Sequence, residues 1–170
     1  LSAVTSGVKE LRAVLQEARD ELTGGGQRTL LFVDEIHHFN KSQQDALLPD
    51  VEEGVVTLVG ATTSNPFFTV NRALVSRSQI FQFEPLEIAH IEALLRRAVE
   101  DPERGLGNHD VRVTDEAFRY LAQVSDGDAR RALNALEIGV LSSSQRPVEF
   151  TIQLAAESVQ RKAIRYDADG

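Results

Sequence analysis

The sequence predicts an α/β layer built on a parallel sheet, followed by a small all-helical domain. Two short apolar runs rich in β-forming residues, 29–33 and 55–59, each follow a segment with helical periodicity. Alternation of helix with strand is typical of parallel sheets, and strands that are apolar on both faces suit the middle of one. After Pro85 only helical patterns remain, so the boundary between the two parts is expected there.

The α/β layer opens with a predicted amphipathic helix that ends at three consecutive glycines, 24–26. Its apolar residues recur at helical spacing: Val8, Leu11, Leu15, Ala18 and Leu22. After the strand at 29–33, Asn40 is a predicted N-cap with Gln43 in the capping-box position. Pro49 is expected to break or restart the helix that Asn40 begins.

The second strand, 55–59, is followed by a polar loop at 62–66. A short helix near Ala73 and a third strand at 79–83 complete the predicted layer. The carboxyl ends of parallel strands meet at one edge of the sheet, and ligand chemistry collects there. Polar residues that directly follow the strands are therefore the first candidates for a site.

Beyond Pro85, apolar residues at helical spacing predict three helices with no strand signal between them. Thr114 and Asp128 are predicted N-caps of the second and third helices, and Gly127 ends the second. Thr151 can open a last helix in the less regular tail. These patterns divide the chain into the α/β part at 1–84, the helical domain at 85–145 and the tail at 146–170.

Composition excludes several classes of protein. With 42% hydrophobic and 26% charged residues, the 170-residue chain has the composition of a globular protein. It has no cysteine, which excludes disulfides and thiolate metal sites, and no run approaches the roughly 18 apolar residues of a membrane span. The net charge of −8 is opposite to that of a non-specific nucleic-acid binder, so any DNA contact is expected to be a local patch. No signal peptide is visible, and we expect the cytoplasm.

Two carboxylates, Asp34 and Glu35, directly follow the first strand. Phosphoryl transfer needs one carboxylate to hold Mg²⁺, usually through water, and another to polarise the attacking water. We expect Asp34 in the first role and Glu35 in the second. The alternative is a strand that ends in acidic residues before an ordinary turn.

Three further polar residues extend this candidate site. Asn65 carries a donor and an acceptor and can orient a water, although an ordinary turn also uses asparagine. Arg77 precedes the third predicted strand, and Arg130 lies at the start of a helix in the second domain. Arginine stays charged and presents a planar fork of donors, so it can stabilise a transferring phosphoryl group. An isolated arginine is otherwise usually a surface residue.

Two adjacent histidines, His37 and His38, suggest a metal site at first sight. They lack the i, i+4 spacing of helical zinc ligands, and no cysteine assists them. We therefore expect solvated or locally hydrogen-bonded histidines.

Taken in order, these motifs resemble the AAA+ ATPase family. The run at 30–35 is similar to its Walker B strand, Asn65 to sensor 1, Arg77 to the arginine finger and Arg130 to sensor 2. Within that family the sequence resembles the replication-associated recombination protein A (MgsA) group, which is related to the Werner helicase-interacting protein. The resemblance rests on residues 2–4, 6–9, 39–45, 60–63, 65–66 and 127–134.

The resemblance implies a fold, ligands and partners. The fold would be part of an AAA+ core followed by a small all-α lid domain, with ATP and Mg²⁺ as ligands. The partners would be DNA at stalled forks, with single-stranded regions, and replication proteins such as single-strand binding protein. A ring-like homo-oligomer is implied because the arginine finger, Arg77, acts on a neighbouring subunit. The role at DNA implies a location at the nucleoid. Lys41 would contact DNA, with a solvated lysine as the alternative. Residues 161–167, in the tail at 146–170, resemble a linker toward a further oligomerisation domain.

Two departures from the family pattern stand out. His38 occupies a position where the family pattern has arginine. No Gly-x-x-x-x-Gly-Lys-Ser/Thr loop occurs in the 170 residues, so the backbone cradle for phosphates and its lysine are missing from them. We expect that loop upstream of Leu1, and we expect these residues alone neither to bind ATP tightly nor to hydrolyse it.

Other assignments remain open. Within the superfamily, a clamp-loader subunit or a Holliday-junction motor is the alternative. Residues 34–37 also spell the acidic box of superfamily 2 helicases, but the paired arginines of their second domain are not found. A non-catalytic interaction module that keeps the ATPase fold is the third possibility, and Glu35 and Arg77 argue against it because a scaffold requires neither.

Overall fold

The computed structural model describes the backbone of residues 1–168 and the side chains of residues 1–160. The chain forms two compact units that divide between Gln82 and Phe83, close to the boundary expected at Pro85. Each unit has its own hydrophobic core. Among the residues that the structure describes, no helix combines the length and hydropathy that a membrane crossing requires.

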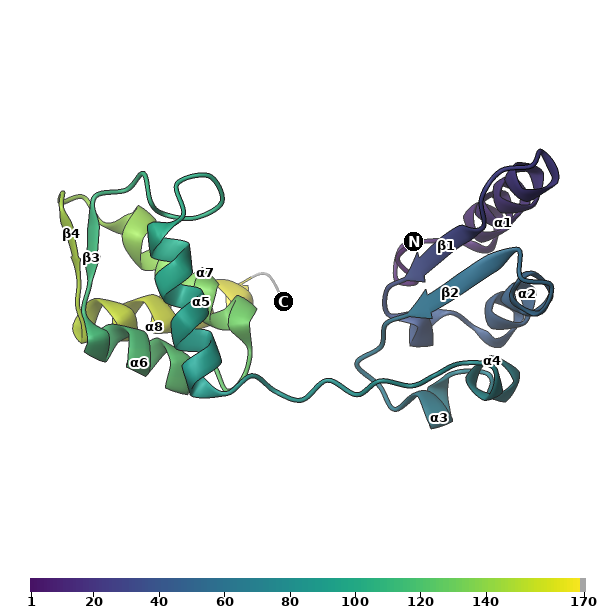
Figure 1. Ribbon diagram of the computed structural model, residues 1–170. Helices are drawn as coiled ribbons and strands as arrows, with labels where there is room; N and C mark the ends of the chain where they lie inside the picture. Colours follow the sequence, from purple (N-terminus) through teal and green to yellow (C-terminus); the bar gives the residue numbers. More distant parts are fainter. Residues whose placement is uncertain (169–170) are drawn as a thin grey trace. The chain divides into compact units, whose positions relative to one another are not determined.

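The first unit is organised around two parallel strands, β1 (Thr29–Val33) and β2 (Val56–Gly60) (Figure 1). Their register places Thr29 opposite Val56 and Val33 opposite Gly60, so both strands end at the same edge. The N-terminal residues extend this arrangement on the other side of β1, where Ser2 forms a parallel bridge with Asp34. The parallel sheet that the sequence predicts is confirmed.

Helices α1 (Val8–Thr23) and α2 (Lys41–Glu52) bury the side of β1 that carries Leu31 and Val33. The side chains that they contribute to this core are Leu11, Leu15, Ala18 and Leu47. The opposite side of β1 differs from the expectation of a strand covered on both faces, since Leu30 is 66% and Phe32 is 51% exposed. The described helices of this unit thus cover one face of the strand.

The start of α2 follows its sequence signal. Asn40 accepts a hydrogen bond from the Gln43 backbone N–H, and the Gln43 side chain accepts one from the Asn40 N–H. This capping box satisfies two backbone donors that have no partner within the helix. The expected break at Pro49 is wrong, because α2 continues through it to Glu52.

Beyond β2, two short helices follow, α3 (Pro66–Thr69) and α4 (Arg72–Ser76). The strand expected at 79–83 is absent, although the sequence there is rich in β-forming residues. A strand needs a neighbour for its backbone donors and acceptors. Neither β1 nor β2 pairs with this segment, and Phe81 is 71% exposed.

Gln44 ties α2 to the chain around α3 and α4. Its side-chain nitrogen donates to the carbonyls of Phe39 at 2.8 Å and Thr69 at 3.2 Å. Its side-chain oxygen accepts from the Asn71 N–H at 2.6 Å, and Asn71 in turn caps α4. Since Gln44 is only 4% exposed, these backbone groups depend on it rather than on water.

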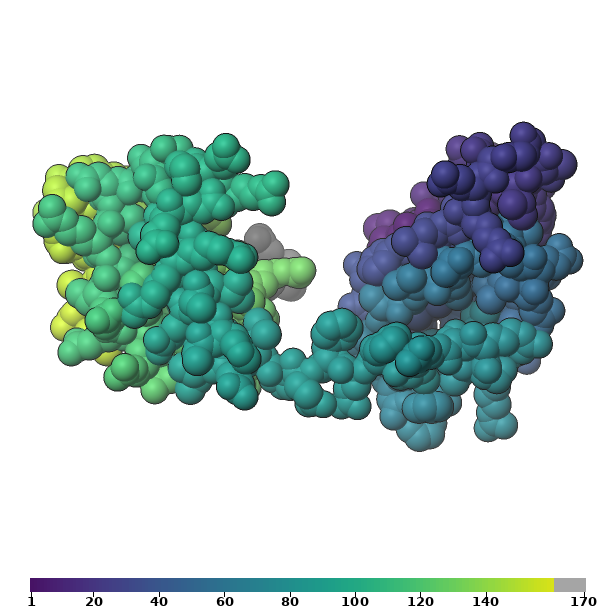
Figure 2. Space-filling model, viewed as in Figure 1, coloured from purple at the N-terminus to yellow at the C-terminus, as the bar shows by residue number. Residues whose placement is uncertain are grey.

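The second unit contains α5 (Ile88–Glu100), α6 (Asp115–Val124), α7 (Ala129–Ser142) and α8 (Ile152–Ala168). Helix α5 lies at the front of this unit in both the ribbon and the space-filling views (Figure 1, Figure 2). Thr114 and Asp128 accept hydrogen bonds from the first turns of α6 and α7, so both predicted N-caps are confirmed. Gly127 has φ +78°, and an added Cβ would lie 2.6 Å from Pro85, so both conformation and space favour glycine there.

The expectation of an all-α second domain needs correction. Strands β3 (Val111–Val113) and β4 (Val148–Phe150) pair in parallel within it. The tail at 146–170 was expected to be a linker, yet Val148, Phe150 and Ala155 belong to the core of this unit. The run at 161–167, which the resemblance singles out, lies outside the residues whose side chains are described.

Replacing Gln44 by leucine should destabilise the first unit. The Asn71 N–H and two carbonyls would lose their partner in a buried setting, which costs about 1–3 kcal/mol. Amide hydrogen exchange of β1 and α2 measures this loss directly. Gln123→Leu, an exposed position on α6, is the matched control. Unchanged exchange in Gln44→Leu would contradict the assigned role.

Candidate functional site

The acidic pair lies where β1 meets the end of β2. The Ala61 N–H donates to the Val33 carbonyl and the Ile36 N–H donates to the Ala61 carbonyl, both at 2.9 Å. Glu35 has φ +52°, in the left-handed region that few non-glycine residues adopt. This conformation ends the strand and begins the short 3-10 helix η1 (Ile36–His38).

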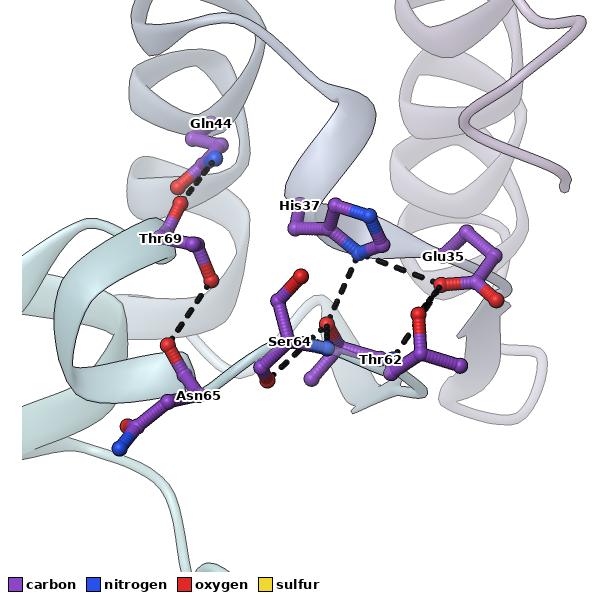
Figure 3. A network of polar contacts seen from close by, with 8 residues as sticks. Glu35, His37, Gln44, Thr62, Ser64, Asn65 and Thr69 are labelled. Atoms are coloured by element: carbon purple, nitrogen blue, oxygen red, sulfur yellow. Dashed lines mark hydrogen bonds and ion pairs between the residues drawn. The ribbon is translucent and has the colours of Figure 1, made fainter.

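The Glu35 carboxylate turns toward the residues that follow β2. Its Oε2 accepts hydrogen bonds from the Thr63 N–H at 3.3 Å and the Thr63 hydroxyl at 3.1 Å. The same oxygen lies 3.2 Å from Nδ1 of His37. Figure 3 shows Glu35, His37 and Thr62 grouped in one network. The two strands therefore bring an acid and a polar loop together, as their shared edge predicts.

His37 is held by the same loop. Its Nδ1 lies 2.9 Å from the Thr62 hydroxyl, and that hydroxyl also accepts from the Ser64 N–H at 3.0 Å. No group of three or more metal-ligating side chains occurs in the part of the chain that the structure describes. Of the two settings expected for the histidines, solvated or locally hydrogen-bonded, His37 has the second.

Asn65 has a different setting from Glu35. Its Oδ1 accepts from the Phe67 N–H at 3.0 Å and so caps α3, while its carbonyl accepts from the Thr69 hydroxyl. In Figure 3 its amide points away from Glu35. The structure thus joins Glu35 to Thr63 and not to Asn65. The sequence signal for Thr63 is its position just beyond β2, which it shares with the rest of the polar loop at 62–66.

Asp34 forms a parallel β-bridge with Ser2, and its side chain is exposed. Its N–H donates to the Leu1 carbonyl and its carbonyl accepts from the Ala3 N–H, both at 2.9 Å. Mg²⁺ keeps several waters and is commonly held by one or two carboxylates together with substrate phosphates. An exposed carboxylate beside Glu35 fits that manner of binding.

Arg77 forms an ion pair within its own chain. Its Nη2 lies 2.7 Å from Oε1 of Glu52, at the end of α2, and its Nη1 donates to the Ala73 carbonyl at 3.0 Å. Both charged side chains are about half exposed, at 44% and 45%. An exposed pair of this kind contributes about 0–1 kcal/mol, so another anion can displace Glu52.

The two remaining candidates lie at helix starts. Lys41 is the first residue of α2 and is exposed. Arg130 is the second residue of α7, in the second unit, and is also exposed. A cation in the first turn is unfavourable beside the positive end of the helix dipole. The helix dipole therefore favours a cation at neither position.

Comparison with known proteins gives a consistent result. Residues 2–86 match the model of the ATPase family associated with various cellular activities (AAA), and residues 107–170 match that of the AAA C-terminal domain. Replication-associated recombination protein A of Escherichia coli is 45% identical over the whole chain, and that of Bacillus subtilis is 42% identical. The Dictyostelium discoideum protein ATPase WRNIP1 is 37% identical over the whole chain.

The chain spans 38% of the Escherichia coli relative, 40% of the Bacillus subtilis one and 21% of the Dictyostelium one. Among solved structures, the Thermotoga maritima RuvB Holliday junction branch migration motor has a TM-score of 0.71 at 22% identity. That match covers 95% of this chain and 51% of the RuvB chain. At this identity the likeness shows the fold alone.

Proposed function

The chain belongs to the AAA family of ATPases, and we propose that it supplies the water-activating and finger residues of an ATPase that acts on DNA. The observation that carries the proposal is the setting of Glu35. A strained left-handed residue turns its carboxylate onto the edge where β1 and β2 end, and Thr63 anchors one of its oxygens there. Such a placement suits a general base that must reach a water beside a phosphate.

We assign the other residues by the same chemistry. Asp34 would hold Mg²⁺ through water, and bound Mg²⁺ would neutralise charge on the phosphates of ATP. Asn65, whose Oδ1 caps α3, would align the attacking water through its Nδ2. Arg130 would bind nucleotide from the lid. Arg77 would leave Glu52 and reach the nucleotide of a neighbouring subunit, which requires a homo-oligomer.

The DNA-related part of the proposal rests on the relatives. Proteins that share 42–45% of this sequence over its whole length are named for replication-associated recombination. We propose that ATP hydrolysis by the whole protein remodels DNA at stalled forks, in single-stranded regions and alongside single-strand binding protein, in the cytoplasm at the nucleoid. Lys41 is the proposed DNA contact, since an exposed lysine at a helix start suits a phosphate.

Replacing Glu35 by glutamine in the whole protein should separate an ATPase from a non-catalytic module. The amide cannot accept a proton from water, so turnover should fall by about 10²- to 10⁴-fold while ATP binding persists. Phosphate release and nucleotide titration measure the two properties. Glu17→Gln, at an exposed position on α1, is the control. A non-catalytic module would show the same phosphate release and ATP binding in the unchanged protein, Glu35→Gln and Glu17→Gln.

Replacing Arg77 by alanine should abolish most turnover and spare ATP binding, because arginine fingers contribute about 10³- to 10⁵-fold to the rate. Mixing Arg77→Ala with Glu35→Gln should partly restore activity if the finger acts between subunits. In the mixed oligomer, the Glu35→Gln subunit supplies the finger to a site with an intact base. Arg72→Ala on α4 is the control. Near-normal rates in Arg77→Ala would refute the finger role.

The 170-residue chain by itself should release no phosphate from Mg–ATP above background. It holds no Gly-x-x-x-x-Gly-Lys-Ser/Thr, whose backbone N–H groups and lysine bind the phosphates. Calorimetric titration should accordingly detect only weak ATP binding. Mg²⁺-dependent phosphate release that disappears in the Glu35→Gln chain would overturn this expectation.

A further inference from the structure

We infer that His37 is a positioning residue for the Glu35 carboxylate: with Thr63 it holds one oxygen so that the other stays free to take the water. This inference deepens the proposed ATPase function and rests on it. The sequence pattern assigns His37 no role in the reaction, whereas its place in the network beside Glu35 suggests one (Figure 3).

The contacts of Glu35 all fall on one oxygen. Oε2 receives the Thr63 N–H and hydroxyl and lies 3.2 Å from Nδ1 of His37. Among the contacts of the described residues, none falls on Oε1, which points away from His37 in Figure 3. A carboxylate can accept about four hydrogen bonds. The two oxygens therefore have different roles: Oε2 is held by hydrogen bonds, and Oε1 can accept a proton.

The hydrogen-bond network determines which nitrogen of His37 carries the proton. A carboxylate oxygen only accepts, so a favourable contact with Glu35 needs hydrogen on Nδ1. The Thr62 hydroxyl can then accept from Nδ1 and from the Ser64 N–H and donate its own proton to the Ser64 carbonyl, 3.3 Å away. The opposite tautomer would set a nitrogen lone pair against the carboxylate. The geometry therefore assigns the Nδ1–H form.

The imidazole is held by contacts within the protein. Its side chain is 16% exposed, its ring centroid lies 4.3 Å from that of His38, and the Thr62 hydroxyl lies 2.9 Å from its Nδ1. A donor locked in this way restricts rotation of the Glu35 carboxylate at little further entropic cost. Orientation of a catalytic group contributes to the rate of the chemical step and little to substrate binding.

The test compares two substitutions of His37 in the whole protein, one by asparagine and one by glutamine. The amide of asparagine can occupy the place of Nδ1, whereas that of glutamine occupies the place of Nε2. We expect His37→Gln to lower the single-turnover rate of ATP hydrolysis about tenfold with unchanged ATP affinity, and His37→Asn to stay within about threefold of the unchanged protein, since orientation rather than binding is lost. His90→Gln, at an exposed position on α5, should have no effect.

Two results would overturn the inference: unchanged rates in both His37 variants, or equal loss in both. Glu35→Gln measured in parallel separates the two levels. If Glu35→Gln hydrolyses ATP normally, the proposed function fails; if it is inactive while His37→Gln is normal, only the role of His37 fails.

Nitrogen NMR on the 170-residue chain tests the contact without any activity. At a pH where the ring is neutral, His37 should show the Nδ1–H tautomer, and Glu35→Ala should shift it toward Nε2–H, because Thr62 can then donate to Nδ1. An Nε2–H ring in the unchanged chain would refute the contact. Because it uses the unchanged chain, this measurement tests the contact between His37 and Glu35 even if a His37 variant does not fold.

Discussion

The parallel pairing of β1 with β2 is the constraint on which the rest of the site depends. Val33 and Gly60 are the last paired residues of the two strands, and the Ala61 carbonyl then accepts a hydrogen bond from the Ile36 N–H. Both strands therefore end at the same edge of the sheet. Only with this register do Glu35 and Thr63 come within hydrogen-bonding distance. A shift of one residue would turn the side chains of β1 to the opposite face and remove Leu31 and Val33 from the core.

Much of this arrangement could be predicted from the sequence because its signals are local. The bounds of β1 follow from its apolar run, and the capping residues Asn40, Thr114 and Asp128 mark helix starts by backbone chemistry that needs no distant partner. The acidic pair and the loop after β2 were correctly expected to share an edge, since that follows from parallel pairing.

Features that depend on distant partners could not be predicted in this way. The segment at 79–83 has strand-like composition but no strand beside it, whereas Val111–Val113 and Val148–Phe150 pair despite being only three residues long. Pro49 is accommodated within α2 rather than ending it. The choice of Thr63 over Asn65 as the partner of Glu35 depends on the left-handed turn at Glu35, and composition gives no indication of such a turn in a non-glycine residue.

The uncovered side of β1 has a consequence for the 170-residue chain when it is in solution by itself. Leu30, Phe32 and, on β2, Val59 present apolar area to water at 66%, 51% and 42% exposure. Apolar area of this kind favours association between molecules, and the net charge of −8 opposes it by repulsion. Salt screens that repulsion over about 10 Å at 0.1 M. The colloidal stability of concentrated samples therefore depends on ionic strength, with low salt keeping the molecules apart.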